Sequence, residues 1–166
     1  RLANNRDSAS VTIWMFFVLA LLVSWAIWIP AYMLVPENCR FPLLLIGGFG
    51  PFLSAIIVVW AKEGKTALKQ WLRVTFRVRI NFMWYLVGGL FLPIAVAILH
   101  HSVYLVAGGK SGFTFNQIWG IYVAKLFSTA LLAGGNEEPG WRGFATPRLM
   151  TKFHPIIANF IVGVFW

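Results

Sequence analysis

The sequence is dominated by apolar runs that are long enough to cross a lipid bilayer as helices. The runs over residues 11–35 and 43–61 carry no charged side chain. A transmembrane helix needs about 20 consecutive apolar residues to cross roughly 30 Å of hydrocarbon. These two runs therefore predict two membrane spans, and further runs at about 82–107 and 117–134 predict two more. A fifth apolar run begins at Pro155 and reaches Trp166, where the sequence stops.

The composition excludes an ordinary soluble domain. Hydrophobic residues make up 59% of the chain and charged residues 11%, a balance that one soluble core could not bury. We predict an all-α fold, a polytopic transmembrane helical bundle, with one membrane domain over 11–166 after a short tail over 1–10. The sequence begins with Arg1 rather than Met and stops inside an apolar run, so we expect it to be the N-terminal portion of a longer protein.

The net charge of +9 is distributed unevenly, which predicts the orientation of the spans. The connection over 62–79 holds six bases and one acid: Lys62, Lys65, Lys69, Arg73, Arg77 and Arg79 against Glu63. Base-rich connections remain in the cytoplasm, so alternation places the N-terminus there too. The apolar residues Leu68, Trp71, Leu72 and Phe76 predict an amphipathic helix in this connection, with anionic lipid headgroups rather than nucleic acid as its partner.

Two adjacent acids stand out in a chain that has only five Asp and Glu residues in all. They occur in the stretch "GGNEEPGWRGF", as Glu137 and Glu138, with Arg142 four residues after the second. On a helix Glu138 and Arg142 share a face and predict an ion pair, while Glu137 points about 100° away and is left free to face a cavity. The alternative is that the preceding helix ends at Gly134 and a solvated loop or a new helix follows. Pro139 favours that alternative, because proline suits the first turn of a helix.

The run "NEEPGWRGFATPRL", residues 136–149, resembles the Glu-Glu-x-x-x-Arg motif of the CPBP family of intramembrane proteases. That family includes the CAAX prenyl endopeptidases, the bacteriocin-processing and immunity proteins, and the lysostaphin-resistance-like proteins. For this chain we expect a multi-pass protein of a bacterial or archaeal cell membrane. The resemblance implies an intramembrane endopeptidase acting on a peptide or prenylated protein. It also implies that Glu137 activates the attacking water and that Glu138 and Arg142 support the site. A carboxylate withdrawn from bulk water is a better general base, which agrees with that role.

The family's other motifs, aromatic-x-x-x-His and His-x-x-x-Asn or Asp, do not occur in this sequence. Phe165 or Trp166 could open the first of these, with its histidine beyond the last residue given. Two such histidines together with Glu137 and Glu138 would suit a divalent metal such as zinc, and a metal-free water activated by glutamate is the alternative. His154 is a weaker candidate ligand, and His100 and His101 are expected to pack or lie at the interface.

Two other functions remain open from the residues alone. One is a non-catalytic bacteriocin-immunity or scaffold protein that binds a partner through the same cavity. The other is a small transporter in which Lys125, a base within the fourth predicted span, works with the glutamates as an ion relay.

Overall fold

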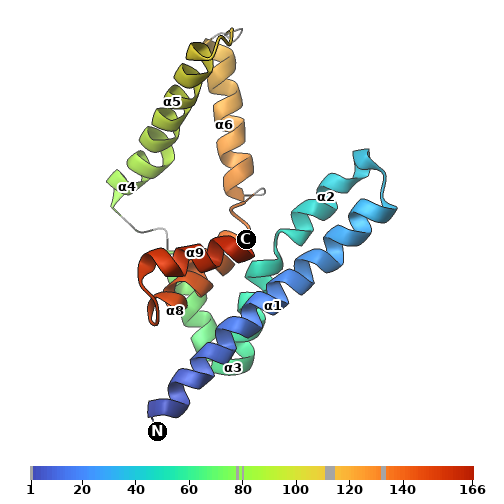
Figure 1. The fold of residues 1–166 in the computed structure, drawn as a ribbon, viewed down its shortest axis with the longest axis vertical. Helices are drawn as coiled ribbons and strands as arrows, with labels where there is room; N and C mark the ends of the chain where they lie inside the picture. The colour runs from blue at the N-terminus through green and yellow to red at the C-terminus, as the bar shows by residue number, and fades with distance from the viewer. Residues whose placement is uncertain (1, 78, 80, 111–114, 132–133) are drawn as a thin grey trace. The chain divides into compact units, whose positions relative to one another are not determined.

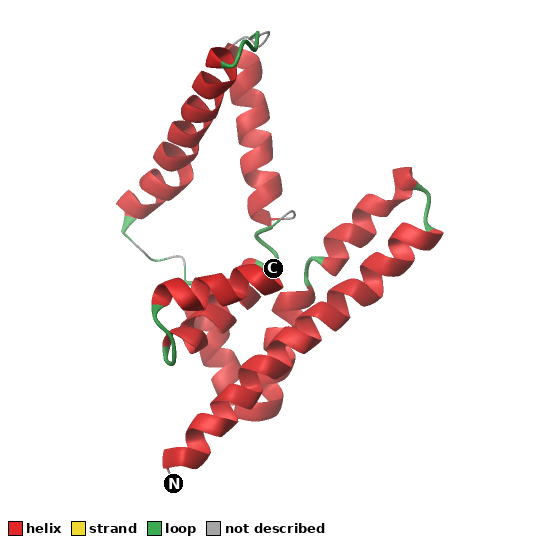
Figure 2. Cartoon of the chain, in the orientation of Figure 1, coloured by secondary structure: helices red, strands yellow, loops and turns green. Residues whose placement is uncertain are grey.

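The computed structural model describes residues 2–77, 79, 81–110, 115–131 and 134–166, and these form helices and loops without a strand (Figure 2). The predicted all-α fold is confirmed. In chain order the elements are α1 (Leu2–Leu34), α2 (Glu37–Gly47), α3 (Gly50–Thr75), α4 (Phe82–Leu86), the π-helix η1 (Val87–Phe91), α5 (Leu92–Val106), α6 (Phe115–Leu131), α7 (Glu138–Gly140), the π-helix η2 (Trp141–Ala145), α8 (Thr146–Met150) and α9 (Pro155–Phe165) (Figure 1).

Three helical stretches of the described chain are long and apolar enough to cross a membrane, namely Thr12–Leu34, Glu37–Thr75 and Phe82–Val106. The first and third of these match the first and third predicted spans, and Glu37–Thr75 contains the second predicted span over 43–61. Helix α6, at 17 residues, covers most of the fourth predicted span, and α9 is a shorter apolar helix at the fifth. The predicted tail over 1–10 is helical from Leu2 onward and continuous with α1, while Arg1 and the side chain of Arg6 lie outside the description.

The second predicted span is not one helix, because a glycine-rich break separates α2 from α3. Gly47 ends α2, and a Cβ at this position would overlap the indole of Trp28, whose Nε1 donates to the carbonyl of Leu44 at 3.0 Å. Pro51 lies in the first turn of α3, a position where its missing N–H costs nothing. Helices α2 and α3 consequently run back along α1 in succession (Figure 1).

The chain divides into two compact units, Arg1–Thr75 with Lys125–Trp166, and Phe76–Ala124. In the first unit α1 and α3 approach closely through small residues, since a Cβ on Gly50 would overlap Ser24 of α1. Close approach of backbones through small residues is the usual basis of helix packing in membranes, where lipid is as apolar as the side chains.

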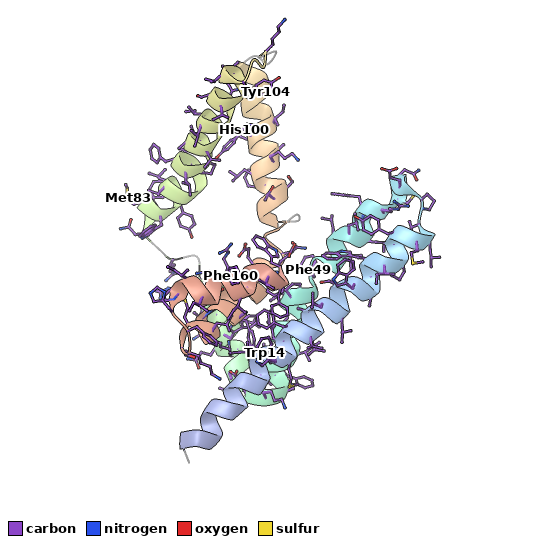
Figure 3. The ribbon with its side chains drawn as sticks, in the orientation of Figure 1. Trp14, Phe49, Met83, His100, Tyr104 and Phe160 are labelled. Carbon is purple, nitrogen blue, oxygen red and sulfur yellow. The ribbon has the colours of Figure 1, made fainter. Side chains whose placement is uncertain are left out.

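Aromatic residues fill the core of the first unit where α1, α3, η2, α8 and α9 meet. Trp14, labelled in Figure 3, lies half-exposed at the edge of this core, with the ring centroids of Phe17 and Phe165 at 5.8 and 5.9 Å. The buried core side chains are Ile13, Phe16, Phe17, Ala20, Ala55, Val58, Val59, Trp141, Phe144, Ala145, Leu149, Ala158 and Val162.

The predicted basic amphipathic helix is the second half of α3. Gly64, with φ 87° and ψ 174°, breaks the helical path, and the helix then continues to Thr75 rather than to 79. Leu68 and Trp71 pack against the protein core, whereas Phe76 is exposed beyond the helix end. Leu68 and Trp71 of this helix are therefore partly covered by protein.

The second unit contains the stretch α4–η1–α5 and the first part of α6. The hydroxyl of Tyr122 on α6 donates to the carbonyl of Gly89 in the π-helix η1 at 2.8 Å. His100, labelled in Figure 3, and His101 are exposed on α5, where His101 stacks on Tyr104.

Candidate functional site

The two glutamates follow a tight turn that is tied to α2 by one buried asparagine. The Oδ1 of Asn136 accepts from the N–H of Gly134 at 3.1 Å, and its Nδ2 donates to the carbonyl of Leu45 at 3.2 Å. Gly134 adopts φ 131°, a region that favours glycine. The turn is packed against protein, so a solvated loop is the wrong interpretation of residues 136–142.

A new helix starts at the glutamates, as the position of Pro139 suggested. Glu137 is the N-cap of α7, and α7, η2 and α8 form one helical stretch from Glu138 to Met150. Gly140 lies directly on α3, because a Cβ there would overlap the backbone of Pro51. Trp141 enters the aromatic core with its ring 5.4 Å from that of Phe16.

The middle of this stretch is the π-helix η2, and a side chain from α3 donates a hydrogen bond to one of its backbone carbonyls. Pro147 has no N–H to donate to the carbonyl of Gly143 four residues earlier. The indole Nε1 of Trp71 donates to that carbonyl instead, at 2.9 Å. The basic half of α3 is thus attached directly to the helix that carries the charged motif. Single π-helical turns of this kind frequently occur at functional sites.

The predicted ion pair between Glu138 and Arg142 is present. The Nε of Arg142 lies 2.5 Å from Oε2 of Glu138, and the side chains are 60% and 35% exposed, respectively. Both residues line an open groove of about 490 Å³. The other lining residues are Val74, Thr75, Gly135, Pro139, Gly143 and Pro147.

The carboxylate of Glu137 accepts hydrogen bonds from two indole rings. The sequence predicts instead that this carboxylate is free to face a cavity. Its Oε2 accepts from Nε1 of Trp141 at 3.2 Å and from Nε1 of Trp166 at 3.0 Å. The guanidinium carbon of Arg142 lies 5.7 Å from the ring centre of Trp166. The spacing of four residues from Glu137 to Trp141 is the signal in the sequence that could have revealed the first of these contacts.

A second ion pair fastens the charged motif to α3. The Nη2 of Arg148 lies 2.7 Å from Oε1 of Glu63, next to the break at Gly64. The same guanidinium lies over the ring of Phe144, with 3.9 Å between its central carbon and the ring centre. In the sequence Glu63 is only a charge within the basic connection, because Glu63 and Arg148 are far apart along the chain.

Among the described residues, no contact joins His154 or Lys125 to the glutamates. His154 caps α9 by accepting from the N–H of Ile156 at 3.4 Å, and Lys125 is exposed with no ion-pair partner in the described part of the chain. Nor do the described residues contain a group of three or more His, Cys, Asp or Glu side chains that could hold a metal ion. A metal held by Glu137 and Glu138 would need further ligands from outside the described residues, so the divalent metal stays a prediction.

The chain is distantly similar in sequence to a known protein. The chain is 27% identical over 164 residues to a protein of Methanococcus maripaludis named CAAX prenyl protease 2. The matched region covers 92% of this chain but 59% of the relative's length. No protein-family model matches the chain, and no solved structure is significantly similar to it.

Proposed function

We propose that the chain is the glutamate-bearing portion of an intramembrane endopeptidase of the CAAX-protease type. The observation that carries the proposal is the arrangement around the Glu-Glu-x-x-x-Arg motif. One glutamate is paired with Arg142 beside an open groove, and its neighbour is held in a separate, partly buried setting. The similarity to a CAAX prenyl protease over most of the chain supports the same function.

In the proposed reaction Glu137 is the general base. Its carboxylate takes a proton from a water molecule, and the oxygen of that water attacks the carbonyl carbon of the scissile peptide. The protonated Glu137 then gives the proton to the leaving nitrogen as the C–N bond breaks, which returns the carboxylate to its starting state. Positioned acids and bases of this kind contribute about 10²- to 10⁴-fold to a rate.

Glu138 and Arg142 act in support of this reaction. Their ion pair keeps one negative charge compensated, so that the adjacent Glu137 is not opposed by a second uncompensated carboxylate. The tetrahedral intermediate also needs donors for its oxyanion. We assign these to further histidines of the whole protein, because the resemblance to the family implies two histidine motifs that this sequence does not contain.

The proposal places the site in a multi-pass protein of a bacterial or archaeal cell membrane, with the N-terminus and the site on the cytoplasmic side. The bases Lys62, Lys65, Lys69 and Arg73 are exposed on α3, while Leu68 and Trp71 of its second half pack against the core. This distribution supports contact between the bases and anionic headgroups.

The direct test is cleavage of a farnesylated CAAX peptide by the whole protein in lipid nanodiscs. We expect Glu137→Ala to lower kcat/KM by at least about 10²-fold, since it removes the base. Cys39→Ala, which changes an exposed thiol of α2, is the matched control and keeps the wild-type rate. Wild-type cleavage by Glu137→Ala would contradict the assignment of the base.

A further inference from the structure

Glu137 is held by two indole rings that come from different helical elements. Trp141 belongs to η2, and Trp166 follows α9. Both donate to Oε2 of Glu137, at 3.2 and 3.0 Å, and within the described chain neither they nor any other donor contacts Oε1. The terminal torsion of a glutamate is broad, so an unheld carboxylate samples many orientations. Two donors on one oxygen select a single orientation.

The first indole is itself rigidly placed. Trp141 is almost fully buried, with its ring edge-on to Phe16 at 5.4 Å and stacked on Phe17 at 6.1 Å. A ring packed in this way cannot change rotamer without opening the core. Trp141 therefore offers its N–H at a fixed point beside Glu137.

The second indole connects Glu137 to the other charged residues of the motif. The ring of Trp166 lies beneath the guanidinium of Arg142, and Arg142 pairs with Glu138. A continuous series of contacts thus runs from Glu138 through Arg142 and Trp166 to Glu137. Displacing Arg142 or Trp166 would therefore change the contacts that hold the carboxylate of Glu137.

We propose that Trp141 and Trp166 are positioning residues that hold Oε2 of Glu137 and reserve Oε1 for the proton of the reacting water. The inference rests on the proposed peptidase function. Productive reaction geometry tolerates errors of only a fraction of an ångström, so fixing a general base in one orientation raises the rate without changing how substrate binds.

The kinetic test uses substitutions that keep a ring and remove the N–H. In the whole protein with the farnesylated peptide, Trp141→Phe and Trp166→Phe each lower kcat about tenfold and change KM by less than about twofold. Trp28→Phe is the matched control, because its indole donates to the backbone carbonyl of Leu44. It keeps the wild-type kcat.

The kinetic outcomes separate the two proposals. If both tryptophan variants keep wild-type kcat while Glu137→Ala is inactive, the positioning role is overturned and the peptidase function stands. If the wild-type protein cleaves nothing, the peptidase function fails and the positioning role falls with it. Trp166 is exposed, so its variant folds even if the buried Trp141 variant does not.

A spectroscopic test reports the contacts without catalysis. In ¹H–¹⁵N spectra of indole-labelled whole protein in micelles, Glu137→Gln shifts the resonances of Trp141 and Trp166, because a neutral amide is a weaker acceptor than a carboxylate. The resonances of Trp28 and Trp71 stay in place, since these indoles donate to backbone carbonyls. Unmoved Trp141 and Trp166 resonances would overturn the inference.

Discussion

At the scale of single residues, two adjacent glutamates have entirely different partners. Glu138 is paired with a guanidinium beside a groove, and Glu137 accepts from two indoles. Successive residues of a helix point about 100° apart, so neighbours in sequence naturally face different surroundings. Two side chains that are chemically identical thus have different interaction partners in the fold.

Arg142→Ala tests whether the Glu138 ion pair serves activity more than stability. The pair is partly exposed, with Arg142 the more exposed member, and ion pairs open to solvent contribute roughly 0–1 kcal/mol to folding. We expect the free energy of unfolding, measured by thermal unfolding in detergent, to fall by less than about 1 kcal/mol. Cleavage should fall about 10²-fold, because the compensating charge is lost.

Arg148→Ala is the matched control for that prediction. It removes the same charge, but from a guanidinium that contacts Glu63 and Phe144. Here we expect a loss of about 1–2 kcal/mol in stability, with nearly normal cleavage by the molecules that remain folded. If Arg148→Ala instead loses cleavage and Arg142→Ala instead loses stability, the roles assigned to the two arginines are wrong.

At the scale of elements, glycines determine how closely the site helix approaches α3. Gly140 touches the backbone of Pro51, and Gly143 lies where a Cβ would come within 2.9 Å of a methyl carbon of Thr75. The sequence shows these glycines as part of a motif, but their partners are more than 60 residues away and are visible only in the fold.

Gly140→Ala should separate these elements. A Cβ would overlap backbone atoms of Pro51 that cannot move aside, and overpacking of this kind costs about 1–3 kcal/mol. We expect a lower unfolding temperature together with reduced cleavage. Gly163→Ala is the control, because a Cβ on that glycine of α9 meets nothing within 4 Å. Equal stability of the two variants would contradict the close approach.

The second half of α3 shows how far an amphipathic pattern can be interpreted. The spacing of Leu68 and Trp71 correctly predicts a helix with one apolar face. The same spacing suits a membrane surface or a protein core, since both are apolar. Only the fold shows that this face packs on protein and that Trp71 reaches the carbonyl of Gly143.

At the scale of the whole molecule, the distribution of bases predicts which side of the membrane each connection faces. Cys39, between the first two predicted spans, is exposed and should lie outside the cell. A cysteine introduced as Lys69→Cys in a Cys39→Ser background should lie inside.

Membrane-impermeant maleimide applied to intact cells checks this orientation, with any cysteines of the rest of the protein replaced. We expect it to label Cys39, and to label the Lys69→Cys variant only after the cells are permeabilised. Labelling of the Lys69→Cys variant in intact cells would place the basic half of α3 outside the cell and contradict the proposed cytoplasmic position of the site.

The sequence by itself determined the all-α class, the first three apolar stretches, and the Glu138–Arg142 pair. These features depend on local composition and on helical spacing, and both involve residues that are close together in the sequence. The tertiary structure alone decided that α2 and α3 are separate helices, that Asn136 and Trp71 attach the motif to distant elements, and that Trp166 joins Trp141 on Glu137. Those contacts join residues up to 91 positions apart. Packing in three dimensions, rather than any periodicity along the chain, brings such residues together.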